Sequence, residues 1–172
     1  MRKISKEKDY YQLVVIFFLI FIYFKFIYFL RDNPYPATLI FLIFLLNFFL
    51  TTRFFYIVIH LFNPQTKYSS FFLTMSYSLV PTLIWFITSS VLFIFFPPPR
   101  TASLLGSGFS ILFFAFSISL LAWKIILIYL ALRFSSRLGF YRILYMMLLF
   151  LVWFLPYSVF LYQVKLFRVP FI

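Results

Sequence analysis

Two lysines lie inside long apolar runs of this sequence, and they are the residues best placed to do chemistry there. Lys25 stands within "FFLIFIYFKFIYFL" and Lys124 within "SLLAWKIILIYLALR". An ammonium group held away from water needs an anion or polar groups around it, so intramembrane cations often mark a binding site. Both lysines are therefore candidate contacts for an anion or a lipid.

Lys124 is the stronger candidate of the two. It precedes Arg133 by nine residues, about 13 Å of helix, and its Cα–Cβ bond tilts away from that nearer helix end. Helical spacing places it on a face with Ser117 and Ala131. Two interpretations stay open: a functional cavity or lipid site that includes Lys124 and Ser117, or snorkelling and structural pairing.

Lys25 precedes Arg31 by only six residues, so its stem could reach the outer interface by snorkelling. The face of the Lys124 helix opposite that lysine carries a stripe of small residues. Small residues let helix backbones approach, so we expect this stripe to be a packing seam. Its members are Gly108, Ala115, Ser119 and Ala122.

Other reactive residues are scarce. The acidic residues are Glu7, Asp9 and Asp32, all near or beyond the ends of apolar runs, and the chain has one histidine and no cysteine. Cation transport and hydrolysis usually need intramembrane carboxylates or metal-binding histidines. We therefore expect no enzyme, no cofactor and no metal site.

The composition predicts where these residues are held. The chain has 172 residues, of which 65% are hydrophobic and 10% charged, and apolar runs of about 20 residues recur along it. This pattern is typical of an all-α polytopic membrane bundle. Pro, Gly, Asn and Ser clusters divide it into five predicted transmembrane helices: about Leu13 to Leu30, Pro36 to Leu61, Tyr77 to Phe96, Gly108 to Arg133, and Phe140 to Val164.

Within these spans, some polar and proline residues have expected structural roles. Asn47 should hydrogen-bond between helices, Trp123 should pack or anchor at an interface, and Pro156 should kink the fifth span. Pro81 falls at the start of the third span, where a missing N–H costs least. We expect a short interfacial helix over "YSSFFLTMSYS" before that proline.

Charge predicts the orientation. With the N-terminus inside, eight basic residues flanking the spans are cytoplasmic and four are external, which satisfies the positive-inside rule. Residues 1–12 then form a basic cytoplasmic N-terminus, residues 13–172 the five-helix domain, and the C-terminus lies outside. The net charge of +12 is spread over span ends, which favours anionic lipid over nucleic acid as partner.

The ordered motifs resemble the Yip1 family of five-span membrane proteins. "YSLVP" resembles its signature at the third span, carried here by Tyr77, Ser78 and Pro81, and "AWKIILIYLALRFSSRLGFYRIL" resembles its fourth span and following turn, with Trp123. The long cytosolic N-terminal region of eukaryotic members is absent, which speaks against Rab GTPase binding. The resemblance implies a short prokaryotic-like member, resident in the bacterial cytoplasmic membrane.

The leading hypothesis is therefore a non-enzymatic Yip1-like integral membrane scaffold or accessory subunit that organises membrane partners, including a protein partner or a second copy. The alternative is a small transporter or lipid-handling protein with a cationic intramembrane site at Lys124. A third hypothesis makes it a subunit of a larger assembly with no activity of its own.

The topology can be tested directly in a chain that lacks cysteine. Ser5→Cys and Val169→Cys should react with an impermeant thiol reagent from opposite sides of the membrane, because an odd number of spans separates them. Labelling of both variants from one side would rule out five spans.

Overall fold

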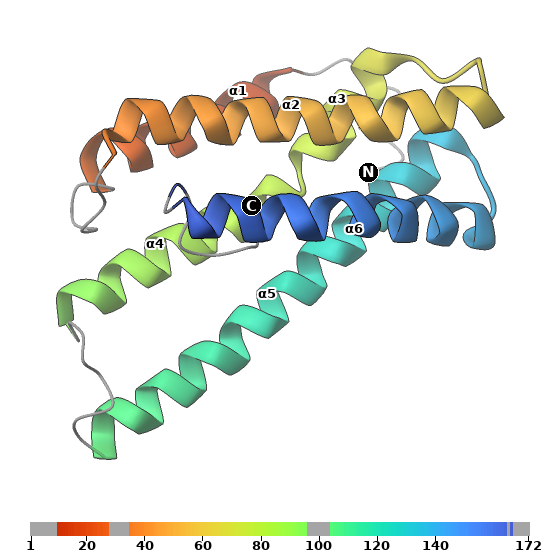
Figure 1. Ribbon diagram of the computed structural model, residues 1–172. Helices are drawn as coiled ribbons and strands as arrows, with labels where there is room; N and C mark the ends of the chain where they lie inside the picture. The colour runs from red at the N-terminus through yellow and green to blue at the C-terminus, as the bar shows by residue number, and fades with distance from the viewer. Residues whose placement is uncertain (1–9, 28–34, 96–103, 165, 167–172) are drawn as a thin grey trace.

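The computed structural model describes residues 10–27, 35–95, 104–164 and 166, and its regular structure there is helical throughout (Figure 1). The elements are α1 (Tyr11–Ile22), which continues as the π-helix η1 (Tyr23–Ile27), α2 (Ala37–Phe62), α3 (Tyr68–Ser76), α4 (Leu79–Phe95), α5 (Leu104–Ser136) and α6 (Phe140–Gln163). Residues 1–9 of the predicted cytoplasmic N-terminus and most of two predicted turns, including Arg31 and Asp32, lie outside the described residues.

Four helical segments in the described ranges are long and apolar enough to cross a membrane: Ala37–Phe62, Tyr68–Leu92, Leu104–Ser136 and Phe140–Gln163. A shorter apolar helix, Tyr11–Phe26, precedes them. The prediction of an all-α integral membrane protein is confirmed, with four to five helices able to span. The orientation in the membrane stays a prediction.

The long helices run in two main directions. In Figure 1, α2 and α6 run alongside each other, whereas α4 and α5 cross that direction obliquely. Contacts agree, since the Tyr157 hydroxyl of α6 bonds to Asn47 of α2, and Trp85 of α4 bonds to Ser117 of α5. The ends of α2 and α5 and the starts of α3 and α6 meet at one end of the molecule.

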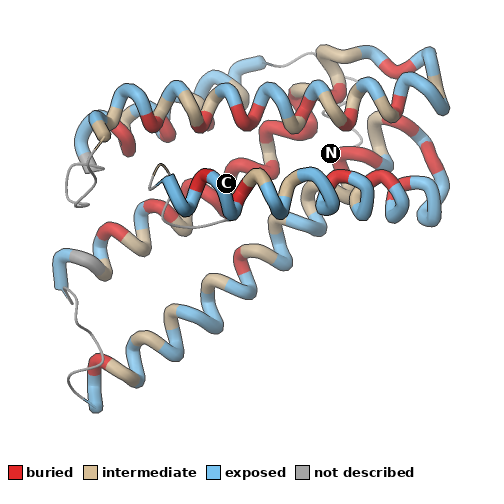
Figure 2. Tube along the Cα trace, viewed as in Figure 1, coloured by how far each residue is buried: buried red, intermediate tan, exposed pale blue. Residues whose placement is uncertain are grey.

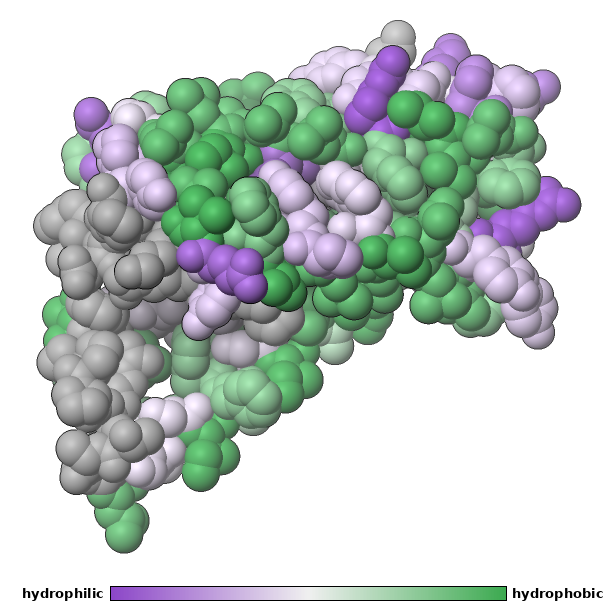
Figure 3. Space-filling model, in the orientation of Figure 1, coloured by the Kyte–Doolittle hydropathy of each residue, from purple (hydrophilic) through white to green (hydrophobic). Residues whose placement is uncertain are grey.

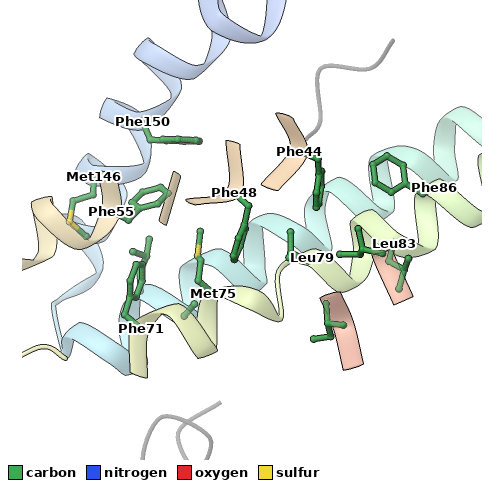
Figure 4. Packing of buried hydrophobic residues seen from close by; sticks show 14 of the residues in the cluster. Phe44, Phe48, Phe55, Phe71, Met75, Leu79, Leu83, Phe86, Met146 and Phe150 are labelled. Atoms are coloured by element: carbon green, nitrogen blue, oxygen red, sulfur yellow. The ribbon is translucent and has the colours of Figure 1, made fainter. Parts of the chain in front are cut away.

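Burial is concentrated in α3 and α4 (Figure 2). In the most apolar stretch of Tyr68–Leu92, 61% of the residues are buried inside the protein, whereas the same share for α5 is 6%. Aromatic rings fill much of this core (Figure 4). Tyr23 of η1, for example, stacks on Phe86 with ring centroids 4.8 Å apart and donates or accepts a hydrogen bond with Ser90 at 3.1 Å.

The small-residue stripe of α5 makes no seam with the other described helices, so the expected packing seam is not found among them. Gly108, Ala115, Ser119 and Ala122 are all exposed, and nothing lies within 4 Å of a Cβ built on Gly108. The helix instead packs on α4 through its other face, because polar side chains there find partners.

The short helix expected before the third span exists as α3, and it is buried against its neighbours. Phe71, Met75 and Ser76 are at most 1% exposed. The helix contacts α1, α2, α4 and α5, which makes it central to the bundle. Its position relative to a membrane surface stays a prediction.

The break between α3 and α4 explains the proline of "SYSLVP". Pro81 is the third residue of α4, so it has no N–H to donate to the Tyr77 carbonyl, and that carbonyl accepts from Val80 N–H at 3.2 Å instead. Ser78 donates its backbone N–H and its hydroxyl to the Met75 carbonyl, at 3.0 and 2.7 Å. The Tyr77 and Met75 carbonyls at the bend are therefore both paired within the joint, which suits a membrane interior.

Pro81→Ala should straighten this joint, because alanine restores the missing donor, with a loss of about 1 to 3 kcal/mol in stability as α3 leaves its site. The measurement is disulfide formation between Thr74→Cys and Ser135→Cys, whose native hydroxyl oxygens lie 2.8 Å apart across α3 and α5. Pro81→Ala should reduce this crosslink. Pro156→Ala is the matched control and should leave it intact; an equal yield in both variants would contradict the prediction.

Candidate functional site

A cavity of about 290 Å³ lies where α2, the α3–α4 joint, α5 and α6 meet. Figure 4 shows several of the aromatic side chains around this region. Its lining is mostly apolar, with a few polar groups: Phe44, Asn47, Phe48, Thr51, Phe55, Met75, Ser78, Leu79, Leu121, Lys124, Ile125, Ile128, Phe150, Leu151, Phe154 and Leu155. We call it the core cavity.

Lys124 brings a positive charge to the core cavity. Its Nζ donates to the Thr82 hydroxyl of α4 at 2.9 Å, and Thr82 is buried. A hydroxyl orients the ammonium group without cancelling its charge. No aspartate or glutamate occurs anywhere in the described ranges, so no carboxylate there can form an ion pair with Lys124.

Asn47 contributes a second donor from α2. Its Oδ1 accepts the Tyr157 hydroxyl of α6 at 2.6 Å, which confirms the predicted interhelical bond. Its Nδ2 is buried and has no hydrogen-bond partner among the residues that the structure describes, with only 4% of Asn47 exposed. Leaving such a donor unpaired costs about 1 to 3 kcal/mol, so Nδ2 is an unmet donor inside the bundle.

The local folding of each element explains these positions. The bend before Pro81 turns Met75, Ser78 and Leu79 into one wall of the core cavity. The opposite wall comes from α6, where Phe150 and Phe154 stack with ring centroids 4.9 Å apart. The space of the core cavity therefore lies between the bend before Pro81 and the stacked rings of Phe150 and Phe154.

Part of the lining of the core cavity is exposed on the outside of the bundle. Among its lining residues, Ile125 of α5 and Leu151 and Leu155 of α6 are exposed apolar side chains. In a membrane this side faces hydrocarbon, so an amphiphilic molecule could enter between α5 and α6.

The other predicted site residues lie elsewhere. Ser117 accepts the Trp85 indole N–H at 3.0 Å and donates to the Phe113 carbonyl at 2.8 Å, so it joins α4 to α5 and does not line the core cavity. Lys25 is exposed on η1, at a separate hollow of about 220 Å³.

Of the signature residues, Ser78 lines the core cavity. The preceding residue, Tyr77, is half-buried, and Pro81 is buried. Trp123 and Pro156 are exposed, and Pro156 lies inside α6 directly before Tyr157.

Sequence reasoning missed two parts of the site. The sequence does not mark Thr82 as a partner of Lys124, because threonine is common in membrane helices. For Asn47 the sequence predicts only a hydrogen bond between helices. The meeting of Lys124 and Asn47 at one cavity depends on contacts between residues far apart in the chain.

No protein-family model, curated protein or solved structure matches this chain. The resemblance to the Yip1 family therefore stays a prediction.

The residue types of the core cavity are those of a binding site. The polar residues of its lining are Lys124, Asn47, Thr51 and Ser78, and the lining holds no carboxylate, histidine or cysteine. Donors in an apolar space stabilise an anionic or strongly accepting group.

The pairing of Lys124 with Thr82 predicts a measurable coupling. Thr82→Val should lower the free energy of unfolding in detergent by about 1 to 2 kcal/mol, because a buried charge loses an acceptor. Lys124→Met should stabilise the protein or leave it unchanged, since it removes the desolvated charge. In the Lys124→Met background, Thr82→Val should lower the free energy of unfolding by less than it does in the wild type. An equal loss in both backgrounds would show that the 2.9 Å contact does not contribute to stability.

Proposed function

We propose that this protein is a non-enzymatic lipid-handling membrane protein whose core cavity binds the acidic group of an anionic lipid. The observation that carries the proposal is that Lys124 and Asn47, whose Nδ2 has no hydrogen-bond partner among the described residues, line one largely apolar cavity inside the bundle. Lys124 supplies the charge and Asn47 Nδ2 a directed hydrogen bond. This is the alternative hypothesis of the sequence analysis, now preferred.

The size and shape of the cavity support a lipid as ligand. A volume of about 290 Å³ is at the lower end for small-molecule sites, too small for a whole phospholipid but sufficient for an acidic group and part of a chain. The remaining chain could leave between α5 and α6, where the exposed lining residues are apolar. A freely soluble anion would have no such apolar route to the cavity.

Membrane scaffolding is the second candidate, favoured by the exposed small-residue face of α5. Gly108, Ala115, Ser119 and Ala122 have no packing role among the described helices, and small residues suit close contact with another membrane helix. This supports a protein partner or a second copy. The resemblance to the Yip1 family also supports residence in a bacterial cytoplasmic membrane.

The lipid proposal is tested by native mass spectrometry of the full chain after incubation with phosphatidylglycerol or phosphatidylcholine. The wild type should retain phosphatidylglycerol preferentially, and Lys124→Met should lose about tenfold of that preference, or 1.4 kcal/mol. Asn47→Ser should weaken retention too, because serine replaces the amide donor with a shorter hydroxyl. Removal of an equal charge at the separate Lys25 hollow, by Lys25→Met, is the control.

Two results would overturn the proposal: no preference in the wild type, or equal losses in Lys124→Met and Lys25→Met. The second result would mean that net charge alone attracts the lipid.

A further inference from the structure

A second hollow lies at the end of the molecule where the α2–α3 and α5–α6 turns meet, and the proposed function does not use it. Its volume is about 880 Å³, and residues of both turns line it. Figure 1 places both turns at the same end, and Figure 3 shows hydrophilic residues gathered on the surface there. We call it the basic-turn pocket.

Three cations line the basic-turn pocket: Lys67 from one turn, and Arg133 and Arg137 from the other side. All three are exposed at their ends, and the described parts of the chain supply no carboxylate to neutralise them. Arg133 Nη1 donates to the Tyr129 hydroxyl at 2.7 Å, a neutral partner that fixes direction and leaves the charge. The pocket is therefore strongly positive.

The two turns are fixed to each other. The Asn63 side chain accepts the Gln65 backbone N–H at 3.2 Å and donates through Nδ2 to the Ser136 carbonyl at 2.9 Å. Thr74 and Ser135 share a further hydroxyl bond at 2.8 Å. The cations accordingly stand on a preorganised frame, which reduces the entropy lost when a ligand binds.

Arg137 occupies a backbone conformation that normally goes to glycine or asparagine. Its φ is 56°, in the left-handed region, and it follows the last residue of α5. Its N–H donates to the Arg133 carbonyl at 3.0 Å, which fixes the turn. Arginine therefore occupies this position at the pocket, although glycine, which has no Cβ, would adopt the left-handed conformation with less strain.

Thr66 supplies an independent sign of a ligand. It lines the basic-turn pocket, is only 7% exposed, and its hydroxyl has no hydrogen-bond partner in the described part of the chain. The helices that begin at the pocket add backbone donors. No side chain caps α3 at Lys67 or α6 at Gly139, and free N–H groups at helix starts attract anions.

From these observations we infer that the basic-turn pocket is a binding site for a phosphate monoester. Lys67, Arg133 and Arg137 balance its charge, and the Thr66 hydroxyl donates to a phosphate oxygen. The pocket lies at the end of the bundle predicted to be cytoplasmic, so the phosphate could belong to a lipid headgroup or to a soluble compound. Both sources share the same recognition chemistry.

The test uses the full chain in phosphatidylcholine nanodiscs, with calorimetric titration of glycerol 3-phosphate for the soluble source. For the lipid source, roughly one part phosphatidic acid to nine of phosphatidylcholine is used, and retained lipid is measured by native mass spectrometry. Lipid measurements use a Lys124→Met background, so that the core cavity does not contribute. Binding in one arm but not the other identifies the source.

Arg137→Gly should weaken binding of the effective probe about tenfold, because one charge is removed while glycine accepts the backbone conformation. Thr66→Val should weaken it about fivefold at unchanged net charge. Arg142→Gln is the matched control, since Arg142 lies over the Phe62 ring at 5.8 Å and does not line the pocket. Arg142→Gln should change the affinity for the probe less than twofold. Raising the salt concentration should weaken binding to the wild type.

The inference is overturned if neither probe binds the wild type, or if Arg142→Gln weakens binding as much as Arg137→Gly. It is also overturned if Thr66→Val, with an unchanged melting temperature, binds as the wild type does. Because these readouts do not involve Lys124, they separate this site from the proposed core-cavity function.

Discussion

The described part of this protein contains lysines and arginines but no aspartate or glutamate. Each lysine and arginine there must be held by something other than a carboxylate of the same part. Lys124 uses the Thr82 hydroxyl, and Arg53 lies 5.8 and 5.7 Å from the ring centroids of Tyr56 and Tyr68. Hydroxyls and aromatic faces orient a cation but do not neutralise it. The protein is therefore equipped with directed positive charge that an external anion can satisfy.

The bend at the α3–α4 joint turns a backbone requirement into a binding wall. A proline in a membrane helix displaces a carbonyl that must be paired nearby, and here Val80 and Ser78 complete the pairing within one turn. The same turn directs Ser78 toward the space that Lys124 reaches from α5. The joint between α3 and α4 thus both pairs its own carbonyls and contributes Met75, Ser78 and Leu79 to the cavity lining.

Local signals in the sequence account for the helices and for single residues, whereas contacts between distant segments account for the sites. Hydropathy predicts the long helices, and Lys124 is conspicuous because cations are rare in apolar runs. The bond from Tyr157 to Asn47 joins residues 110 apart, and no local pattern encodes it. The same limit explains why the stripe at Ala115 was assigned to internal packing. Small residues predict close contact but do not say with which helix.

The length of α5 links the core cavity to its surroundings. A helix of 33 residues is about 50 Å long, whereas the hydrocarbon layer of a bilayer is about 30 Å thick. The helix must therefore tilt, or extend beyond that layer, to an extent set by bilayer thickness. Since α5 and α6 diverge from a short turn, the tilt of α5 also governs how far apart Ile125 and Leu155 stand. Bilayer thickness is therefore expected to affect the spacing of these two lining residues of the core cavity.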